Sequence, residues 1–273
     1  MNAQPPRPPD DLRERPPAAL RRFLSTWPRR IGALVGSAFL AWAVAQFAPA
    51  LWEETSKRTG IAPASLQVEV VMDPDLIKTT DPLHNPEFIV QRPIGEVGPP
   101  PNGSDEQGRY SWAKEMDGVD ALGTVLRLVI RGRSEAPVTL HGLEVEIVAR
   151  RPPLAGTLLT YDGQGAGQAV RYFEIGLDEE PPSAAYMDDK ASEAVPFPYR
   201  VSQTELEVFD IYAFTLKHYV EWRLRLAYTD DEGDGTIVID DDGQPFKTSA
   251  HGGQDPLPGQ HAYFWLNGGW VGS

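Results

Sequence analysis

An acidic segment near the C-terminus, DDEGDGTIVIDD, carries oxygen ligands at the alternating positions of a calcium-binding loop. Its candidate ligands stand at positions one, three, five and twelve, with a glycine at six. These ligands are Asp230, Glu232, Asp234 and Asp241. Alternate oxygens in such a loop converge on one hard cation, so the spacing predicts a calcium site. Glu232 is longer than the usual ligand at its position, and Asp241 replaces the usual bidentate glutamate.

The same segment also fits an acidic turn between two strands. Ile237 and Ile239 alternate with other residues, which is the pattern of a strand with one buried face. In that interpretation the carboxylates are solvated and hold no metal. The sequence leaves both interpretations open, and calcium is the only cofactor that it suggests.

Residue patterns typical of catalysis are weak in this chain. The five histidines are dispersed, none at the spacing of a zinc-binding helix, and no nucleophile elbow is present. We expect His218, which lies between strand residues, to be a packing or surface side chain. Four carboxylates, any two of which at the right separation would serve, could supply the acid and nucleophile of a glycosidase, and so of an exported cell-envelope hydrolase. These are Glu179, Glu180, Asp188 and Asp189. Such pairs arise by chance in an acidic chain, so we expect no enzyme and keep the hydrolase as the alternative.

Aromatic residues gather near the C-terminus, at Tyr263, Phe264, Trp265 and Trp270. Half-exposed aromatic side chains could line a surface for carbohydrate or for a protein partner. They could also belong to a terminal strand that closes the β-sandwich. We favour the terminal strand.

Eight segments alternate apolar and polar residues in the manner of strands, and turn-forming residues separate several of them. They are 66–72, 124–131, 138–150, 169–177, 205–216, 218–228, 236–240 and 262–266. This pattern predicts a mainly β chain with an immunoglobulin-like antiparallel β-sandwich. Two long insertions, 73–118 and 178–198, interrupt it, and the sequence does not decide whether they are ordered.

Residues 31–52 carry no charge and could cross a membrane as one helix. Twenty-two residues at about 1.5 Å each exceed a hydrocarbon core of about 30 Å. Arginines precede the span and the following flank is neutral, which places the N-terminus in the cytoplasm. The expected order is a disordered Pro/Arg-rich cytoplasmic tail (1–30), the transmembrane helix (31–52), a juxtamembrane stalk (53–64) and an extracytoplasmic domain (65–273). The alternative is a signal cleaved near Ala48, Pro49 and Ala50, which would make the domain secreted.

Small residues form a stripe along this span. Gly32 and Gly36 make a GxxxG motif, which lets two membrane helices approach closely. The motif predicts a homodimer through the membrane helix. The alternative is that glycine and alanine are simply common in such helices.

Charge is divided unequally between the two sides of the span. Seven arginines against three carboxylates give residues 1–30 a net charge of +4, and residues 53–58 cancel. Because the whole chain carries −14, residues 59–273 carry −18. A surface this acidic repels phosphate backbones, so nucleic acid is not expected as a partner. Basic partners and cations are favoured.

The segments RGRSEAPVTLHGLEVEIVARRPPL and IDDDGQPFKT are similar to strand and turn patterns of exported immunoglobulin-like domains. In organisation the chain resembles uncharacterised single-pass membrane proteins of high-GC actinobacteria, which pair an arginine-flanked anchor with an exported β domain. The resemblance implies a topology and no activity. We therefore expect a membrane-anchored module that binds a protein partner in the cell envelope or assists assembly. A structural component of an envelope complex is a further alternative.

Overall fold

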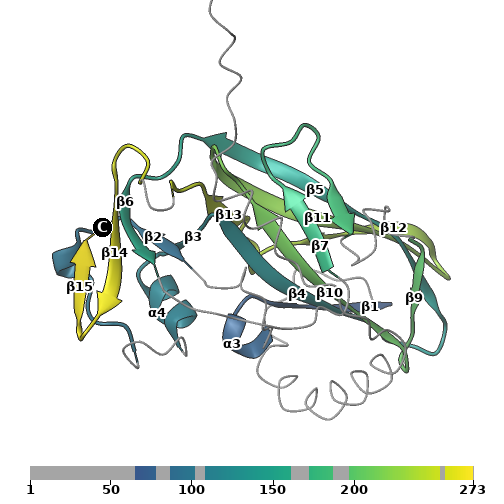
Figure 1. Ribbon diagram of the computed structural model, residues 1–273. Coiled ribbons are helices and arrows are strands. Elements are labelled where there is room, and N and C mark those ends of the chain that lie inside the picture. Colours follow the sequence, from purple (N-terminus) through teal and green to yellow (C-terminus); the bar gives the residue numbers. More distant parts are fainter. Residues whose placement is uncertain are drawn as a thin grey trace, which may run out of the picture. The chain divides into compact units, whose positions relative to one another are not determined.

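The computed structural model describes residues 65–77, 87–101, 108–160, 172–186, 197–252 and 256–272 (Figure 1). The expected tail, membrane helix and stalk lie outside these ranges, as do Gly32, Gly36, Asp188 and Asp189. Across the described ranges, every helix is too short or too polar to span a bilayer.

The described chain is mainly β, as the alternating segments predict, and its strands form two sheets. The smaller sheet has five strands in the order β1-β4-β10-β7-β8. Their bounds are β1 (Leu66–Val71), β4 (Gly123–Gly132), β10 (Leu206–Phe214), β7 (Tyr172–Gly176) and β8 (Ala184–Tyr186).

The larger sheet has ten strands in the order β15-β14-β6-β2-β3-β13-β11-β5-β9, with β12 also paired to β11. Their bounds are β2 (Phe88–Val90), β3 (Val119–Ala121), β5 (Val138–Arg151), β6 (Gly156–Thr160), β9 (Tyr199–Val201), β11 (Tyr219–Asp230), β12 (Gly233–Ile239), β13 (Phe246–Ser249), β14 (Gln260–Leu266) and β15 (Gly269–Gly272). Three short helices complete the described elements: α3 (Pro74–Ile77), η2 (Ile94–Glu96) and α4 (Arg109–Glu115).

The main hydrophobic core lies between the smaller sheet and the part of the larger sheet around β11 and β5. Alternation builds it: Trp222, Leu224 and Leu226 of β11 are fully buried, whereas Arg225 is exposed. On the facing sheet, β4 buries every second side chain in the same core: Leu126, Leu128 and Ile130. Two sheets that share one core in this way fit the predicted β-sandwich.

The strands β15-β14-β6-β2-β3 extend the larger sheet beyond the main core and have small cores of their own. Phe88 and Leu159 pack against Ala113 of α4 on one face. Ile89 and Leu158 pack against Ala262 on the other. Period-two alternation explains both cores, because neighbouring residues of β2 and of β6 point to opposite faces. We call these five strands and α4 the side sheet.

The side sheet meets the main sandwich through a narrow pairing of β3 with β13. Only Asp120 and Ala121 pair there, with Thr248 and Ser249. A buried polar chain reinforces the junction. Lys114 Nζ donates to Asp120 Oδ1 at 2.7 Å, and Thr124 Oγ1 donates to Asp120 Oδ2 at 2.7 Å.

The outer face of the smaller sheet carries a buried ion pair. Arg127 of β4 donates from Nε and Nη2 to the two carboxylate oxygens of Asp210 on β10, at 2.6 and 2.8 Å. Asp210 is 1% exposed, and its hydrophobic neighbours on the strand face, Val208 and Tyr212, are also buried. A bidentate geometry of this kind satisfies a carboxylate that water does not reach.

Two expectations need correction. Pairing is not antiparallel throughout, because β7 with β10, β3 with β13 and β6 with β14 run parallel. Parallel neighbours need crossover connections rather than tight turns, and the residue alternation carries no information about strand direction. The insertion 73–118 is also not simply a loop, because β2, η2 and α4 lie within it and supply part of the side sheet.

Candidate functional site

The acidic segment forms a β-hairpin. Strand β11 ends at Asp230, which pairs with Gly233, so Asp231 and Glu232 form the turn. The turn is organised around Asp230, whose carboxylate accepts hydrogen bonds from Ser65 Oγ at 2.5 Å and from the Glu232 N–H at 2.9 Å. The Ser65 hydroxyl lowers the pKa of Asp230 below its ordinary value, and backbone N–H groups of the turn act in the same direction.

The hairpin does not bring Asp241 to the other three carboxylates. Thr229 pairs with Asp234 near the turn, whereas Leu224 pairs with Ile239 five residues back along β11. An extended strand advances about 3.3 Å per residue, so Asp234 lies roughly 17 Å from Ile239, the last residue of β12, and Asp241 follows beyond that end. Among the described residues, no group of three or more histidines or carboxylates could hold a metal ion. The backbone of this segment is a β-hairpin, as in the second interpretation of the sequence, and calcium binding stays a prediction.

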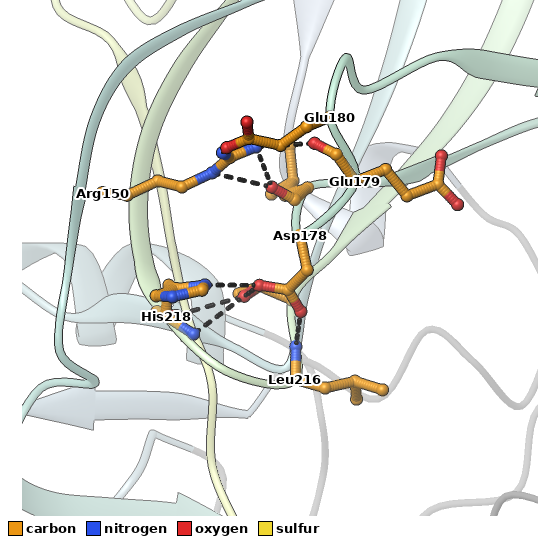
Figure 2. Close-up of polar contacts among 8 residues, drawn as sticks. Arg150, Asp178, Glu179, Glu180, Leu216 and His218 are labelled. Carbon is orange, nitrogen blue, oxygen red and sulfur yellow. Dashed lines mark hydrogen bonds and ion pairs between the residues drawn. The ribbon is translucent and has the colours of Figure 1, made fainter.

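A polar cluster occupies the place where the β7–β8 connection meets the β10–β11 connection (Figure 2). Asp178 accepts hydrogen bonds from Thr215 Oγ1 at 2.9 Å and from the Leu216 N–H at 2.7 Å. Its carboxylate also lies 2.8 Å from His218 Nδ1. Burial acts to raise the pKa of Asp178, but these hydrogen bonds outweigh it and hold the pKa below the ordinary value.

Arg150 joins the same connection to the opposite sheet. From β5 its guanidinium donates to the carbonyl oxygens of Leu177 and Glu179, at 2.9 and 2.7 Å, and forms an ion pair with Glu180. Figure 2 shows Arg150 reaching the backbone beside Glu179 and Glu180 while Asp178 points to His218. The cluster therefore joins the β7–β8 connection to the β10–β11 connection and, through Arg150, to the larger sheet.

Of the four predicted carboxylates, Glu179 and Glu180 lie among the described residues. Glu180 is engaged by Arg150, whereas Glu179 lies over Gly176. Glu174, two residues before Gly176 in β7, has a pKa raised first by burial and second by the charge of Glu179. His218 Nδ1 faces Asp178, and its side chain is partly exposed. The contact with Asp178 fixes the orientation of the His218 ring. Its role as a packing or surface side chain stays a prediction.

The second candidate is the C-terminal hairpin β14–β15, yellow in Figure 1 beside α4. Trp265 and Trp270 are cross-strand partners whose rings meet edge to face at 5.1 Å. Trp270 also stacks on Trp112 of α4, with ring centroids 6.3 Å apart, and its indole N–H donates to the Gly98 carbonyl at 3.2 Å. The tryptophans therefore hold the hairpin firmly against α4. The sequence predicted a terminal strand that closes the sandwich, whereas β14 and β15 end the side sheet and contribute no residue to the main core.

The opposite face of this hairpin is open to solvent. Leu266 is 51% and Val271 is 48% exposed, and Phe264, the cross-strand partner of Val271, is partly exposed beside them. Phe264, Leu266 and Val271 lie on the face away from the tryptophans, because side chains alternate along each strand. We call these three residues the apolar patch.

Sequence reasoning predicted strand 262–266 but missed its partner and the role of Trp112. The missed signal is Asn267-Gly268, which follows the strand directly. Both residues have positive φ, 52° and 83°, which is the geometry of a type I′ turn. Trp112 could not be assigned to the same cluster, because α4 lies far from the hairpin in sequence.

Comparison of the chain with protein-family models, with curated proteins and with solved structures gives no match. Function therefore has to be inferred from the geometry and chemistry of these residues.

Proposed function

We propose that this chain is a membrane-anchored, extracytoplasmic binding or assembly module, an immunoglobulin-like β-sandwich that contacts a protein partner through the apolar patch. The observation that carries the proposal is the pair of exposed aliphatic side chains, Leu266 and Val271, on a firmly held hairpin. Apolar side chains on a rigid support bind well because little conformational freedom is lost when a partner covers them.

The tryptophan face of the hairpin is a poorer candidate for the contact. Trp270 stacks on Trp112, meets the edge of Trp265 and uses its N–H within the chain. A flat sugar-binding platform needs a free ring face, so these contacts favour a structural role for the tryptophans. The apolar patch on the other side then supplies the contact with a partner.

The polar cluster supports binding over catalysis. Glu180 is paired with Arg150, and Asp178 is occupied by Thr215, Leu216 and His218. A hydrolase needs two carboxylates aimed at a shared substrate position. The contacts of Glu180 and Asp178 are instead directed to the two connections that they hold together.

The membrane anchor in this proposal rests on the uncharged segment 31–52 and the arginines before it. A reporter enzyme that is active only outside the cytoplasm, fused to the C-terminus, tests this topology. We expect reporter activity in cells expressing the full chain. Activity confined to a reporter that works inside the cell would contradict the proposed topology.

Site-specific cross-linking tests the contact surface. A photoreactive amino acid is placed at Leu266 or Val271 in the full chain, and at Val148 or Val238 as controls, which are 44% and 41% exposed on other strands. After irradiation of intact cells, we expect the same discrete adduct from both hairpin positions and none from the controls. The absence of an adduct from the hairpin, or equal adducts from all four positions, would contradict the proposal.

A further inference from the structure

We propose that β15 receives an extended, basic peptide segment of the partner as an additional strand of the larger sheet. This inference rests on the proposed function, because it names the chemistry of the partner and its mode of contact with the hairpin. Strand addition at a sheet edge uses backbone hydrogen bonds for affinity and alternate side-chain contacts for selectivity.

The turn geometry determines which backbone groups of β15 face the open edge. In a two-residue type I′ hairpin, the residues that flank the turn, here Leu266 and Gly269, form the hydrogen-bonded pair. Pairs alternate along an antiparallel ladder, so Trp265 with Trp270 is a non-hydrogen-bonded pair. The N–H and C=O groups of Trp270 and Gly272 therefore point away from β14.

These outward groups have no backbone partner in the part of the chain that the structure describes. Strand β15 is the last strand in the order of the larger sheet and pairs with β14 alone. The described backbone hydrogen bonds outside strands and helices do not include Trp270 or Gly272. Gly272 is exposed and Trp270 is partly exposed, so solvent reaches this edge.

The residues of β15 lack the usual protection of an edge strand. Natural edges are blunted by charged residues, proline or close coverage. The edge strands β9 and β12 carry exposed Arg200 and exposed Asp234, respectively, whereas β15 reads Gly-Trp-Val-Gly. No charged side chain or proline within β15 would therefore oppose the approach of another strand.

The net charge of the chain indicates which kind of segment would pair with the open edge of β15. Residues 59–273 carry a net charge of −18, so a second copy of the chain would meet an equally acidic surface. Like charge slows and weakens such an encounter, whereas opposite charge steers a basic segment toward the domain. Apolar side chains alternating with basic ones would cover Val271 and Leu266 on one face of the added strand. The favoured partner is therefore an extended lysine- or arginine-bearing segment with alternating aliphatic residues.

Binding of two labelled peptides to the purified full chain in detergent tests this inference. The probe KVKVKVK has the favoured pattern, and EVEVEVE has the same apolar residues with opposite charge. Two protein variants test the edge itself. Gly272→Pro removes the N–H that faces the edge, and Gly272→Ala retains it. An added Cβ at Gly272 meets only Tyr263, at 3.5 Å, so the alanine variant is a fair control.

We expect KVKVKVK to bind the parent chain and Gly272→Ala equally. Loss of one backbone hydrogen bond in Gly272→Pro should weaken binding about three- to tenfold. Val271→Lys should weaken it at least as much, whereas Val238→Lys on β12 should not. Bound peptide should also slow amide hydrogen exchange in residues 269–272.

Equal binding of both peptides, or unchanged binding to Gly272→Pro, would overturn the strand-addition inference. If the cross-linked adduct at Leu266 and Val271 persists in that case, the partner contacts the apolar patch by another mode and the proposed function stands. If the adduct is also missing, the proposed function fails independently of the peptide result.

Discussion

The indole N–H of Trp222 donates a hydrogen bond to Thr248 Oγ1 at 3.0 Å, and both side chains are fully buried. Thr248 Oγ1 in turn lies 2.7 Å from Thr124 Oγ1, which donates to Asp120. Asp120 is paired with Lys114 of α4. One chain of contacts thus runs from the main core, where Trp222 packs, to the helix that covers the side sheet. Because these groups are shielded from water, each depends on its neighbour for hydrogen bonding.

Replacing Thr248 by valine tests the importance of this chain. Thr248→Val keeps the shape but leaves the Trp222 N–H and the Thr124 hydroxyl without that partner. We expect a loss of about 1–3 kcal/mol in the free energy of unfolding, measured by urea denaturation. Thr236→Val, on the exposed face of β12, is the matched control and should change stability by no more than about 0.5 kcal/mol. Equal effects of the two substitutions would contradict a role for the network.

Removing one partner of the ion pair on the outer face of the smaller sheet should lower the free energy of unfolding strongly. Replacing both partners by apolar residues should lower it much less. Arg127→Met leaves the carboxylate of Asp210 buried without its bidentate partner. We expect a loss of about 3–5 kcal/mol, and recovery of most of it when Asp210→Leu is added. Urea denaturation of the two single variants and the double variant measures the coupling. Additive losses would show that the two side chains act separately.

Asp178 should make stability depend on pH in the acid range. Its pKa lies below the ordinary value of 3.8 in the folded chain, so ionised Asp178 stabilises the fold. That contribution is fully present above the ordinary pKa and is lost as pH falls through the folded pKa. We expect Asp178→Asn to lower the thermal midpoint at pH 7 and to flatten its decline in acid. Asp231→Asn in the exposed hairpin turn is the control, and an identical acid profile in both variants would contradict this role.

Glu174 should make stability depend on pH in the opposite sense, so that stability falls as pH rises. Burial and the Glu179 charge raise its pKa above 4.5, so the folded chain favours the protonated form. Stability is therefore reduced as pH rises from the ordinary pKa through the raised one, and the penalty persists at neutral pH. We expect Glu174→Gln to raise the thermal midpoint at pH 7 and to have little effect at pH 4. Glu179→Gln should give a smaller gain, because its charge is the lesser cause; a larger gain than in Glu174→Gln would reverse this assignment.

The hairpin geometry limits calcium affinity at Asp230. Asp241 lies beyond the far end of β12, so at most Asp230, Glu232 and Asp234 could contact a cation at the turn. We expect any calcium binding to be no tighter than about 1 mM, at the weak end for protein sites. Calorimetry with calcium on the full chain measures it, with Asp234→Asn as the comparison. A submicromolar site would show that the segment forms a closed loop instead of the hairpin.

The sequence predicted the parts of the fold where alternation is long. Trp222, Leu224 and Leu226 share one face of a long strand, and the structure buries that face. Strands of three residues, such as β2 and β3, leave too short a pattern to recognise. Their positions are decided by long-range packing, as with Phe88 against Ala113.

The candidate sites were less predictable than the strands. Asp178 and His218 are brought together by two connections that lie 40 residues apart in the sequence, and neither local segment indicates the other. The hairpin at Asn267-Gly268 did have a local signal, the turn dipeptide after an apolar strand. The face that it leaves exposed depends on Trp112, which only the folded chain places beneath the hairpin.

The two-residue pairing of β3 with β13 also has a consequence for the order in which the molecule loosens. A junction with so few backbone hydrogen bonds can separate before the main core unfolds. Under mild denaturant, the side sheet should then unfold as a unit, so that the amides of β14 and β15 become exchangeable while those of β4 and β11 remain protected. The surface proposed for partner binding would thus belong to a separate cooperative unit, which an incoming strand could tighten.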